Sequence, residues 1–486
     1  MDYSRLTQEE MLSIVQNGLK RPLTPKRIIV AGAGMAGLVA ASLLHAAGHE
    51  VHLLESSQRV GGRVFTIRTP FTYGNHLEAG AMRFPETHKL VLAYIKKFSL
   101  HTQEFINSQP HDLIYVNGIM TENRTYEKNP DILGFPVTVS EKGKTAEQLM
   151  KYAVQPLIDF IEQDPDKNWP AIIKRFQSYS LDNFLRNNPF GRSLSSGAID
   201  MIKVLLSLEG LPELSFLDVF RDILIIFINP KLKYLEIVGG NDQLPKAFLP
   251  QLKNHIFFSQ RLTRIVQDQN KVTLYTESPL TSHPYVFEAD KVIITIPFSV
   301  LNFVKIEPFH SLSYYKRKAI RELHYVPSTK IGIEFNHRFW EKNGLSGGKS
   351  VTDLSTRFTH YPNQKRASSS SGVVIASYTW EDDTVPWRSF PNRIRVKEAL
   401  DFLSLFHGPQ VYEYFVTGHA HSWSLDPHTG GAFTMFKPYQ EEEIYEAIKA
   451  PEGRLHFAGE HTTLKHGWVE GAIESGIRAA MEVNET

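Results

Sequence analysis

Residues 28–37 read IIVAGAGMAG, a β-branched run that leads into a glycine motif of the form GxGxxG. This pattern predicts a strand, a tight turn and a helix. Gly32 makes the turn, Gly34 lets a pyrophosphate approach the backbone, and Gly37 lets the helix pack on the strand. The phosphate then lies at the helix N-terminus, where unpaired N–H groups and the helix dipole favour an anion. The stretch predicts a dinucleotide-binding unit.

The following residues complete a βαβ unit. Residues 38–47 are rich in Ala and Leu, Gly48 ends the expected helix, and residues 51–54 form a second apolar strand that ends at Glu55. From that position the Glu55 carboxylate can accept hydrogen bonds from ribose hydroxyls, and it repels a 2′-phosphate. The glycine motif alone does not distinguish NAD from FAD.

Size and composition set limits on the function. With 486 residues, about two to four packed units are expected. The 53 basic and 52 acidic side chains give no reason to propose nucleic acid or an anionic membrane as a partner. The absence of cysteine excludes disulfides, Cys-ligated metals, catalytic thiols and a cysteinyl flavin. No secretory signal is visible, and the longest apolar run, within residues 223–228, is far shorter than the ~20 residues of a membrane span. We therefore expect a soluble, cytoplasmic protein, or a secreted one if a signal was removed.

Hydrophobic periodicity predicts the remaining elements. Helices are expected over residues 4–20, 146–161, 200–208, 216–227 and 471–483, strands over 272–275, 291–296 and 455–458, and a polar loop over 363–371.

Two further motifs favour FAD over NAD. Residues 59–63, RVGGR, follow Glu55 closely and resemble the RxGGR extension of the glutathione-reductase-like flavoproteins, in which Arg63 can meet a diphosphate with a planar set of donors. At the other end of the chain, a strand ending in Gly459-Glu460 is followed by residues 467–472, GWVEGA, and a helix. A second helix N-terminus there could hold the ribityl and pyrophosphate end of FAD.

At this point the chain resembles, nearly from end to end, the flavin-containing L-amino-acid oxidases of the snake-venom and bacterial type. The matching stretches are residues 9–19, 33–37, 61–63, 80–85 (GAMRFP), 236–239 with 244–245, 329–330, 361–363, 430–431 and 466–468 (HGW). Many unrelated proteins share the glycine motif, whereas the Met82-Arg83 and Gly467-Trp468 motifs are specific to far fewer families.

The resemblance implies an α/β fold (α+β overall) with a Rossmann-like FAD-binding domain of the glutathione-reductase type, a mixed-sheet substrate domain and a helical domain. The expected boundaries are 26–68, 236–324 and 436–486 for the FAD-binding domain, 4–22, 69–135 and 325–435 for the substrate-binding domain, and 136–235 for the helical domain.

FAD is expected to bind without a covalent bond, and the absence of cysteine excludes a cysteinyl linkage. The predicted contacts are Gly32, Gly34, Met35, Ala36, Gly37, Glu55, Ser56, Gly62, Arg63, Gly80, Ala81, Met82, Arg83, Leu262, Glu460, Gly467, Trp468, Val469 and Ala472.

The resemblance places the substrate carboxylate on Arg83 and Tyr378. A guanidinium can pair with a carboxylate through two hydrogen bonds, which fixes orientation as well as affinity. Tyr378 and Trp380 would share one face of a strand, with Trp380 lining the side-chain pocket. The alternatives are an ordinary salt bridge or a flavin contact for Arg83, and plain core packing for the two aromatic residues.

The same resemblance places the Gly467 carbonyl and Trp468 at the substrate amine. Lys330 matches the lysine that holds a water near the flavin and is implicated in the reaction of reduced flavin with oxygen, although a strand lysine is otherwise usually a solvated edge residue. Ala432 stands where the snake-venom relatives carry a larger aliphatic residue, so it could enlarge the pocket.

One difference from those relatives concerns the base. Residues 223–228 contain no histidine where the snake-venom enzymes carry a mobile one. Either no base is essential, the amine losing its proton to water, or another group serves. His419 and His421 lack an apparent third ligand, so no metal site is predicted.

The predicted reaction is oxidation of an L-amino acid by O2 and water to a 2-oxo acid, NH3 and H2O2, with hydride transfer from Cα to flavin N5. Large hydrophobic or aromatic substrates and a homodimer or higher homo-oligomer are expected. The alternatives are a monoamine or polyamine oxidase, a tryptophan-2-monooxygenase-like enzyme that yields an amide and CO2, and a non-enzymatic flavin-binding protein.

Overall fold

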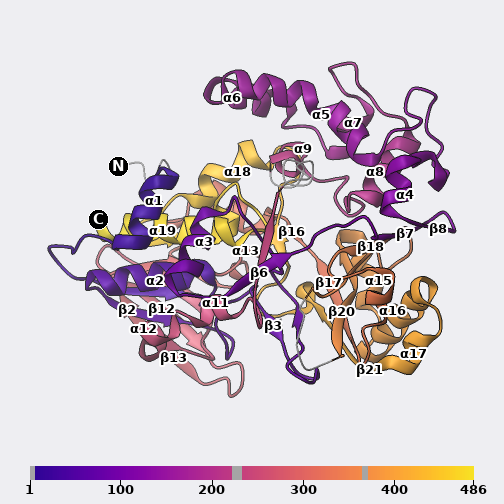
Figure 1. The fold of residues 1–486 in the computed structure, drawn as a ribbon. Helices are drawn as coiled ribbons and strands as arrows, with labels where there is room; N and C mark the ends of the chain where they lie inside the picture. The colour runs from indigo at the N-terminus through magenta and orange to yellow at the C-terminus, as the bar shows by residue number, and fades with distance from the viewer. Residues whose placement is uncertain (1–5, 222–231, 364–369, 486) are drawn as a thin grey trace.

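The computed structural model describes residues 6–221, 232–363 and 370–485. In Figure 1 the indigo N-terminal segment and the yellow C-terminal segment lie together on the left. The orange segment forms a separate half at the lower right, and helices α4 to α8 form a lobe at the upper right. Both ends of the chain therefore belong to one part of the molecule.

A five-stranded parallel sheet lies in that part, in the order β10-β2-β1-β14-β23. Its strands are β10 (Ile256–Phe257), β2 (Glu50–Leu54), β1 (Arg27–Ala31), β14 (Lys291–Ile294) and β23 (Leu455–Phe457). The apolar run of β1 is buried because strands pair with it on both edges. The predicted βαβ unit is confirmed, although the sheet takes strands from three distant segments.

Two helices cover this sheet from opposite ends of the sequence, α2 (Met35–Ala47) and α19 (Val469–Glu485). They pack closely, since a Cβ on Gly476 would lie 2.6 Å from the carbonyl oxygen of Ala36. The closing helix predicted over residues 471–483 is present as α19 and is two residues longer at each end. The N-terminal helix α1 (Gln8–Asn17) is shorter than predicted and begins with a capping box formed by Thr7 and Glu10.

A four-stranded sheet stands beside the parallel sheet, in the order β13-β12-β11-β15. It consists of β11 (Arg261–Gln267), β12 (Val272–Glu277), β13 (Pro284–Ala289) and β15 (Lys305–Glu307). Helices α14 (Tyr314–Glu322) and α18 (Gln440–Lys449) pack against each other nearby. The predicted strand over 272–275 is present.

The second half contains a mixed seven-stranded sheet, in the order β21-β17-β20-β19-β18-β7-β8. Its strands are β21 (Phe415–Ser422), β17 (Ser328–Phe335), β20 (Gly372–Trp380), β19 (Phe358–His360), β18 (Lys349–Thr352), β7 (Leu113–Val116) and β8 (Ile119–Glu122). Every residue of β17 is buried, since the strand is paired on both sides. A three-stranded sheet joins β6 (Thr102–Phe105) and β5 (Phe84–Pro85) to β9 (Tyr234–Ile237).

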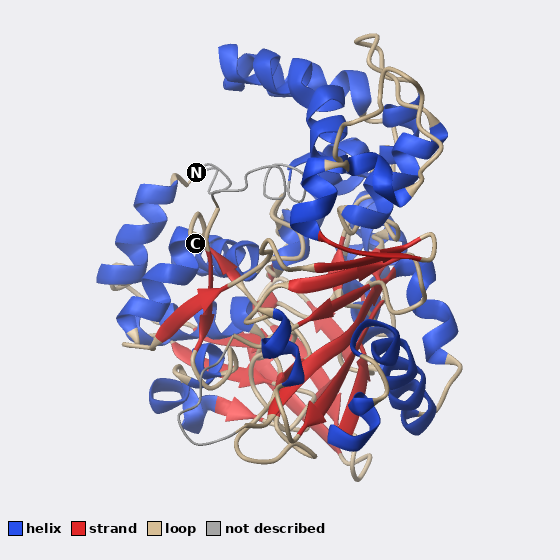
Figure 2. Cartoon of the chain, turned by 45° about the vertical axis from the view of Figure 1, so that its right-hand side comes forward, coloured by secondary structure: helices blue, strands red, loops and turns tan. Residues whose placement is uncertain are grey.

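The helical lobe projects at the top of Figure 2. It contains α4 (Asn123–Lys128), α5 (Ala146–Gln163), α6 (Pro165–Phe176), α7 (Leu181–Arg186) and α8 (Ser196–Leu205), with α9 (Phe216–Val219) leading back from it. Hydroxyl side chains cap α5, α7 and α8, and Phe184 stacks on Phe216 inside the lobe.

Further sequence predictions need correction or reach beyond the described residues. The helix expected at 200–208 begins four residues earlier and ends at Leu205. The helix expected over 216–227, and the apolar stretch 223–228 within it, extend beyond residue 221 and so lie partly or wholly outside the described residues, as does most of the loop 363–371. Over residues 6–221, 232–363 and 370–485, no helix is long and apolar enough to cross a bilayer.

Candidate active site

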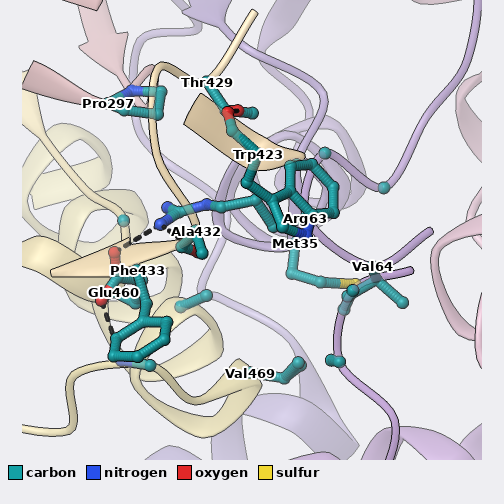
Figure 3. Close-up of a pocket in the computed structure, with 18 of the residues that line it drawn as sticks. Met35, Arg63, Val64, Pro297, Trp423, Thr429, Ala432, Phe433, Glu460 and Val469 are labelled. Carbon is teal, nitrogen blue, oxygen red and sulfur yellow. Dashed lines mark hydrogen bonds and ion pairs between the residues drawn. The ribbon is translucent and has the colours of Figure 1, made fainter. Parts of the chain in front are cut away.

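A long cavity runs from the carboxyl end of β1 to the end of β20 and collects residues from both halves of the molecule. Figure 3 shows part of its wall, with Met35, Arg63, Ala432, Glu460 and Val469 around the space. Twenty of the predicted cofactor and substrate contacts line this cavity, together with Lys330. The lining residues named in advance are Gly32, Gly34, Met35, Ala36, Glu55, Ser56, Gly62, Arg63, Gly80, Ala81, Met82, Arg83, Lys330, Tyr378, Trp380, Ala432, Glu460, Gly467, Trp468, Val469 and Ala472.

Two predicted cofactor contacts lie outside this wall. Gly37 packs against the backbone of the glycine turn, because a Cβ at this position would lie 1.9 Å from the carbonyl oxygen of Gly32. Its role is therefore to let α2 approach β1 closely. Leu262 lines a smaller hollow that shares Gly32, Ser56 and His428 with the cavity. Leu262 therefore borders an extension of the site near β2 instead of the cavity itself.

The N-terminus of α2 fits a phosphate group. A Cβ on Gly34 would meet no protein atom within 4 Å, although Gly34 lies in the cavity wall. The helix has no side-chain cap at Gly34 and no acidic residue in its first turn. The first N–H groups of a helix have no partner within the helix. Gly34 therefore leaves space for an anionic group at a helix end that favours negative charge.

Glu55 ends β2 at the wall of the cavity and is 8% exposed. Its carboxylate accepts hydrogen bonds from the backbone N–H groups of Ala33 and Ser57, both at 2.8 Å. These bonds link the glycine turn to the end of β2. Further acceptor positions on the same carboxylate suit ribose hydroxyls.

Arg63 and Glu460 connect the two flavin motifs directly. Arg63 donates to the Glu460 carboxylate at 2.7 Å and to the carbonyl oxygen of Ala432 at 3.2 Å (Figure 3). Burial alone would raise the pKa of Glu460, but Arg63 and two histidines outweigh it and hold that pKa below its usual value. The other Glu460 oxygen accepts from the Gly467 N–H at 3.0 Å. Glu460 is thus an ionised group that fixes both Arg63 and the 467–472 segment.

Lys330 is buried on β17, a strand that is paired on both edges, and 2% of its surface is exposed. Its Nζ donates to the carbonyl oxygens of Glu78 at 3.1 Å and Gly80 at 2.7 Å. The ammonium group also lies 4.4 Å from the ring centroid of Tyr378. Burial lowers the pKa of Lys330 to about 7. The alternative of a solvated edge lysine is therefore wrong.

Arg83 enters the cavity close to Tyr378. Its guanidinium lies over the rings of Phe105 and Tyr234, with distances of 5.7 Å and 5.3 Å to the ring centroids. Burial lowers the pKa of Arg83, while the nearby Tyr234 and Tyr378 act to raise it. Because arginine remains charged in proteins, this arrangement presents a half-buried cation to the cavity.

Tyr378 and Trp380 lie on the same face of β20, as their spacing predicts. Their ring centroids are 5.1 Å apart at an angle of 84°, and Trp380 also contacts Phe433 at 5.9 Å. Both line the cavity instead of the core alone. Burial raises the pKa of Tyr378, so its hydroxyl keeps its proton at neutral pH.

Trp468 also lines the cavity. Its ring meets His88 edge to face, with centroids 4.9 Å apart. The preceding His466 also lines the cavity, and its Nδ1 lies 2.9 Å from the carboxylate of Asp218, with both side chains fully buried. This pair ties the Gly467-Trp468 turn to α9.

Sequence reasoning did not name the remaining residues of the wall as contacts, and most of these residues belong to no local motif. These residues are Ser57, Arg59, Gly61, Val64, Ala79, Thr295, Ile296, Pro297, Ser328, Trp423, His428, Thr429, Phe433, Met435, Gly459 and His466. Trp423 illustrates the reason, because its indole N–H donates to the carbonyl oxygen of Ala79, 344 residues earlier. Four of them could have been found from the sequence, because they lie within motifs that it shows: Arg59 and Gly61 in residues 59–63, Gly459 beside Glu460, and His466 in residues 466–468.

Comparison with known proteins agrees with this geometry. The family described as flavin containing amine oxidoreductase matches residues 35–484. The chain is 49% identical over 479 residues to "Putative L-amino-acid oxidase YobN" of Bacillus subtilis (strain 168), covering 99% of both chains. It is 38% identical over 480 residues to an L-amino-acid oxidase of Pseudechis australis, covering 98% of this chain and 90% of that one. Among solved structures, cyclohexylamine oxidase from Brevibacterium oxydans IH-35A shares the fold, with a TM-score of 0.74 at 19% identity over 95% of this chain and 99% of that one. This chain belongs to the family of flavin-containing amine oxidoreductases.

Proposed function

We propose that the protein is an FAD-dependent L-amino-acid oxidase. It converts an L-amino acid, O2 and water to a 2-oxo acid, NH3 and H2O2. The observation that carries the proposal is the position of Arg83 and Tyr378 in one cavity with both flavin motifs. A substrate with a carboxylate needs such a cation, whereas a simple amine does not. The names of the relatives support the same activity.

The residues of the cavity suit FAD as the cofactor. The α2 N-terminus and Arg63 would hold its diphosphate, and Glu55 its adenosine ribose. Gly80, Ala81, Met82 and Val469 line the same cavity as Lys330 and Trp468. FAD supplies the hydride acceptor for the reaction.

The protein residues bind and orient the amino acid. Arg83 pairs with the substrate carboxylate, and the Tyr378 hydroxyl donates to it. The Gly467 carbonyl accepts from the amine, and Trp468 limits its position. These contacts would aim the Cα hydrogen at the flavin. Such orientation is the main contribution of the protein to the rate of the reaction.

The amine must be neutral before oxidation, and Lys330 serves another step. Residues 223–228, which carry no histidine, lie outside the described residues. In the proposed mechanism the amine loses its proton to water. Lys330 lies in the cavity wall, where its Nζ would hold a water beside the bound cofactor for the reaction with oxygen.

The aromatic wall favours large hydrophobic or aromatic side chains. Trp380 and Phe433 provide extended apolar surface, and Ala432, a small residue of the same cavity wall, leaves room beside them. Apolar area contributes about 25 cal/mol per Å² when it leaves water. Replacing Trp380 with Ala should therefore raise KM for L-phenylalanine more than for L-alanine.

Product analysis tests the proposed function. The purified holoenzyme is supplied with L-phenylalanine, and oxygen uptake, 2-oxo acid, ammonia and peroxide are measured together. One equivalent of each product per O2 supports an oxidase. Formation of an amide and CO2 instead identifies a monooxygenase, and turnover of phenethylamine but not of the amino acid identifies an amine oxidase.

A further inference from the structure

His428 lies where the main cavity meets the smaller hollow that contains Leu262. The residue lines both spaces, as do Gly32 and Ser56. Gly32 belongs to the glycine turn after β1, and Ser56 follows Glu55 at the end of β2. Because nucleotides bind beyond the carboxyl ends of such parallel strands, this junction lies where the ADP half of FAD is expected.

The loop that carries His428 is fixed by its own hydrogen bonds. It follows β21 of the second half and leads to β22 (Phe433–Thr434). The Asp426 carboxylate accepts from the backbone N–H of His428 at 2.8 Å. The hydroxyl of Ser299, which comes shortly after β14 of the parallel sheet, donates to the carbonyl oxygen of Thr429 at 2.7 Å. The loop of one half is thus held against the other half beside His428.

Ser56 orients the imidazole ring. Its Oγ lies 2.8 Å from Nδ1 of His428 and 3.5 Å from the Glu55 carboxylate, the second distance being at the limit of a hydrogen bond. The shorter contact indicates that the hydroxyl donates to Nδ1, which places the ring proton on Nε2. His428 is half-buried, and no group in the described part of the chain accepts a hydrogen bond from Nε2. The ring therefore keeps one N–H donor for a ligand.

The surroundings of this donor match a nucleoside diphosphate. The smaller hollow has a mostly apolar wall that suits a flat base, and its apolar residues are Ala31, Leu54, Leu262, Ile296 and Val300. The junction itself offers the glycine turn, the end of β2 and the ring of His428. Ribose and phosphate oxygens are hydrogen-bond acceptors, so a ligand that passes this junction needs donors of this kind.

We propose that His428 is a cofactor-binding residue, which together with Ser56 holds a ribose or phosphate oxygen of the ADP half of FAD. Neither the glycine motif nor the RxGGR motif includes this residue. Through it, a loop of the second half completes the wall around the dinucleotide. The proposal concerns the cofactor alone, so it stands or falls independently of whether L-amino acids reduce the flavin.

FAD affinity tests this role without measuring activity. FAD is removed from the purified protein, and the dissociation constant of added FAD is measured by flavin fluorescence. His428→Leu removes the donor, so the constant should rise about fivefold, the effect of one lost hydrogen bond. His428→Gln supplies an amide N–H group in place of Nε2 and should restore most of the affinity. An unchanged FAD affinity in His428→Leu overturns the proposal.

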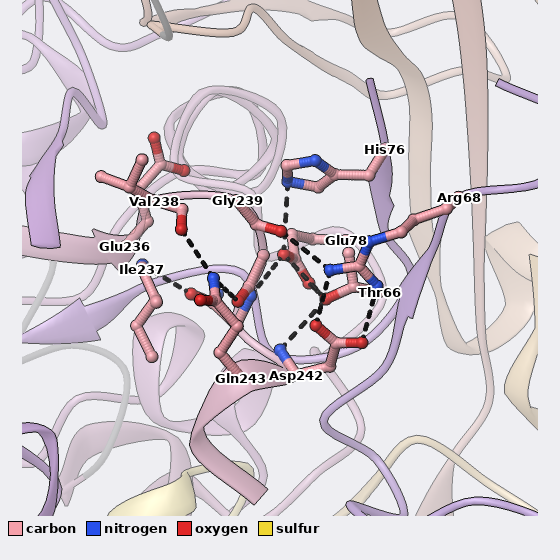
Figure 4. Close-up of polar contacts among 12 residues, drawn as sticks. Thr66, Arg68, His76, Glu78, Glu236, Ile237, Val238, Gly239, Asp242 and Gln243 are labelled. Atoms are coloured by element: carbon pink, nitrogen blue, oxygen red, sulfur yellow. Dashed lines mark hydrogen bonds and ion pairs between the residues drawn. The ribbon is translucent and has the colours of Figure 1, made fainter. Parts of the chain in front are cut away.

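His76→Leu is the matched control. His76 precedes β4 (Leu77–Glu78), which pairs with β3 (Thr66–Ile67), and its Nε2 lies 3.6 Å from the Glu78 carboxylate (Figure 4). Like His428, this histidine contacts a polar side chain, but it lines neither the cavity nor the smaller hollow. FAD affinity should therefore stay unchanged in His76→Leu. An equal loss of affinity in the two leucine variants overturns the proposal.

Chemical protection of the unaltered apoprotein covers the case in which the variants do not fold. Diethyl pyrocarbonate modifies accessible imidazole nitrogens, and mass spectrometry of the peptides locates each modified histidine. ADP and riboflavin, the two halves of FAD, are added separately. ADP should slow the modification of His428 several-fold and riboflavin should not, while the exposed His310 reacts equally in both. Modification of His428 at the same rate with and without ADP, or equal protection by riboflavin, overturns the proposal.

Discussion

Arg63 donates a hydrogen bond to Glu460 across 2.7 Å, although the two residues are 397 positions apart in the sequence. Arg63 follows the glycine motif, and Glu460 follows the last strand of the parallel sheet. Their contact brings the two flavin motifs to one wall of the cavity. The predicted convergence of the chain ends on one cofactor rests on this pair.

Replacing Arg63 with Gln should leave the Glu460 carboxylate without its cation. Breaking a buried pair from one side costs about 3 kcal/mol, and the diphosphate also loses a donor. We expect lower thermal stability of the apoprotein and a lower ratio of bound flavin to protein after gel filtration. Arg27→Gln is the control, because its pair with Glu50 is exposed and contributes less than about 1 kcal/mol. Equal effects of the two variants would contradict this role.

The glycines of the opening motif should separate folding from cofactor binding. Gly37→Ala places a Cβ 1.9 Å from a backbone oxygen, so the apoprotein should lose about 2 kcal/mol or more of stability. Gly34→Ala meets no protein atom within 4 Å, so the apoprotein should fold normally but bind FAD at least tenfold more weakly, a loss of about 1.4 kcal/mol. Thermal unfolding of apoprotein and FAD titration measure the two effects. Normal FAD affinity in Gly34→Ala would show that no phosphate lies there.

Arg83 should matter for the substrate and not for the flavin alone. Arg83→Lys keeps a charge but loses the two-pronged geometry, and Arg83→Ala loses both. We expect kcat/KM for L-phenylalanine to fall by about 100-fold or more in Arg83→Ala and less in Arg83→Lys, since a charge-assisted pair contributes about 3 kcal/mol. Steady-state kinetics, with the flavin content checked by absorbance, measures this. Loss of flavin instead of activity would assign Arg83 to the cofactor.

Glu141 should make the helical lobe sensitive to acid. Burial alone would raise its pKa, but four hydrogen bonds from Ser195 and Thr138 lower it to about 2. A depressed carboxyl pKa stabilises the fold above pH 4.5, and this contribution disappears as the pH falls toward about 2. Glu141→Gln should therefore lower the melting temperature at neutral pH, and the difference should shrink with acid. The exposed Glu147→Gln should change little at any pH.

Local motifs explain how much of the site the sequence could predict. The sequence predicts the glycines, Arg63 and Glu460 as cofactor contacts, because each belongs to a motif of only a few consecutive residues. His466 and Asp218 could not be paired from the sequence, since their contact depends on how α9 meets the turn before α19. The burial of Lys330 required knowing that β17 is paired on both edges.

Fold-level predictions had a similar limit. The elements with strong periodicity are present, but the order of the parallel sheet depends on long-range pairing. The residue boundaries of the three domains, the homo-oligomer and the cytoplasmic location remain predictions.

Anaerobic reduction of the bound flavin tests the central claim most directly. The holoenzyme is mixed without oxygen with a panel of L-amino acids and with the amines that lack only their carboxylates. We predict that large hydrophobic and aromatic L-amino acids bleach the flavin and that the matching amines do not. Bleaching by the amines alone, or by no member of the panel, would contradict an L-amino-acid oxidase.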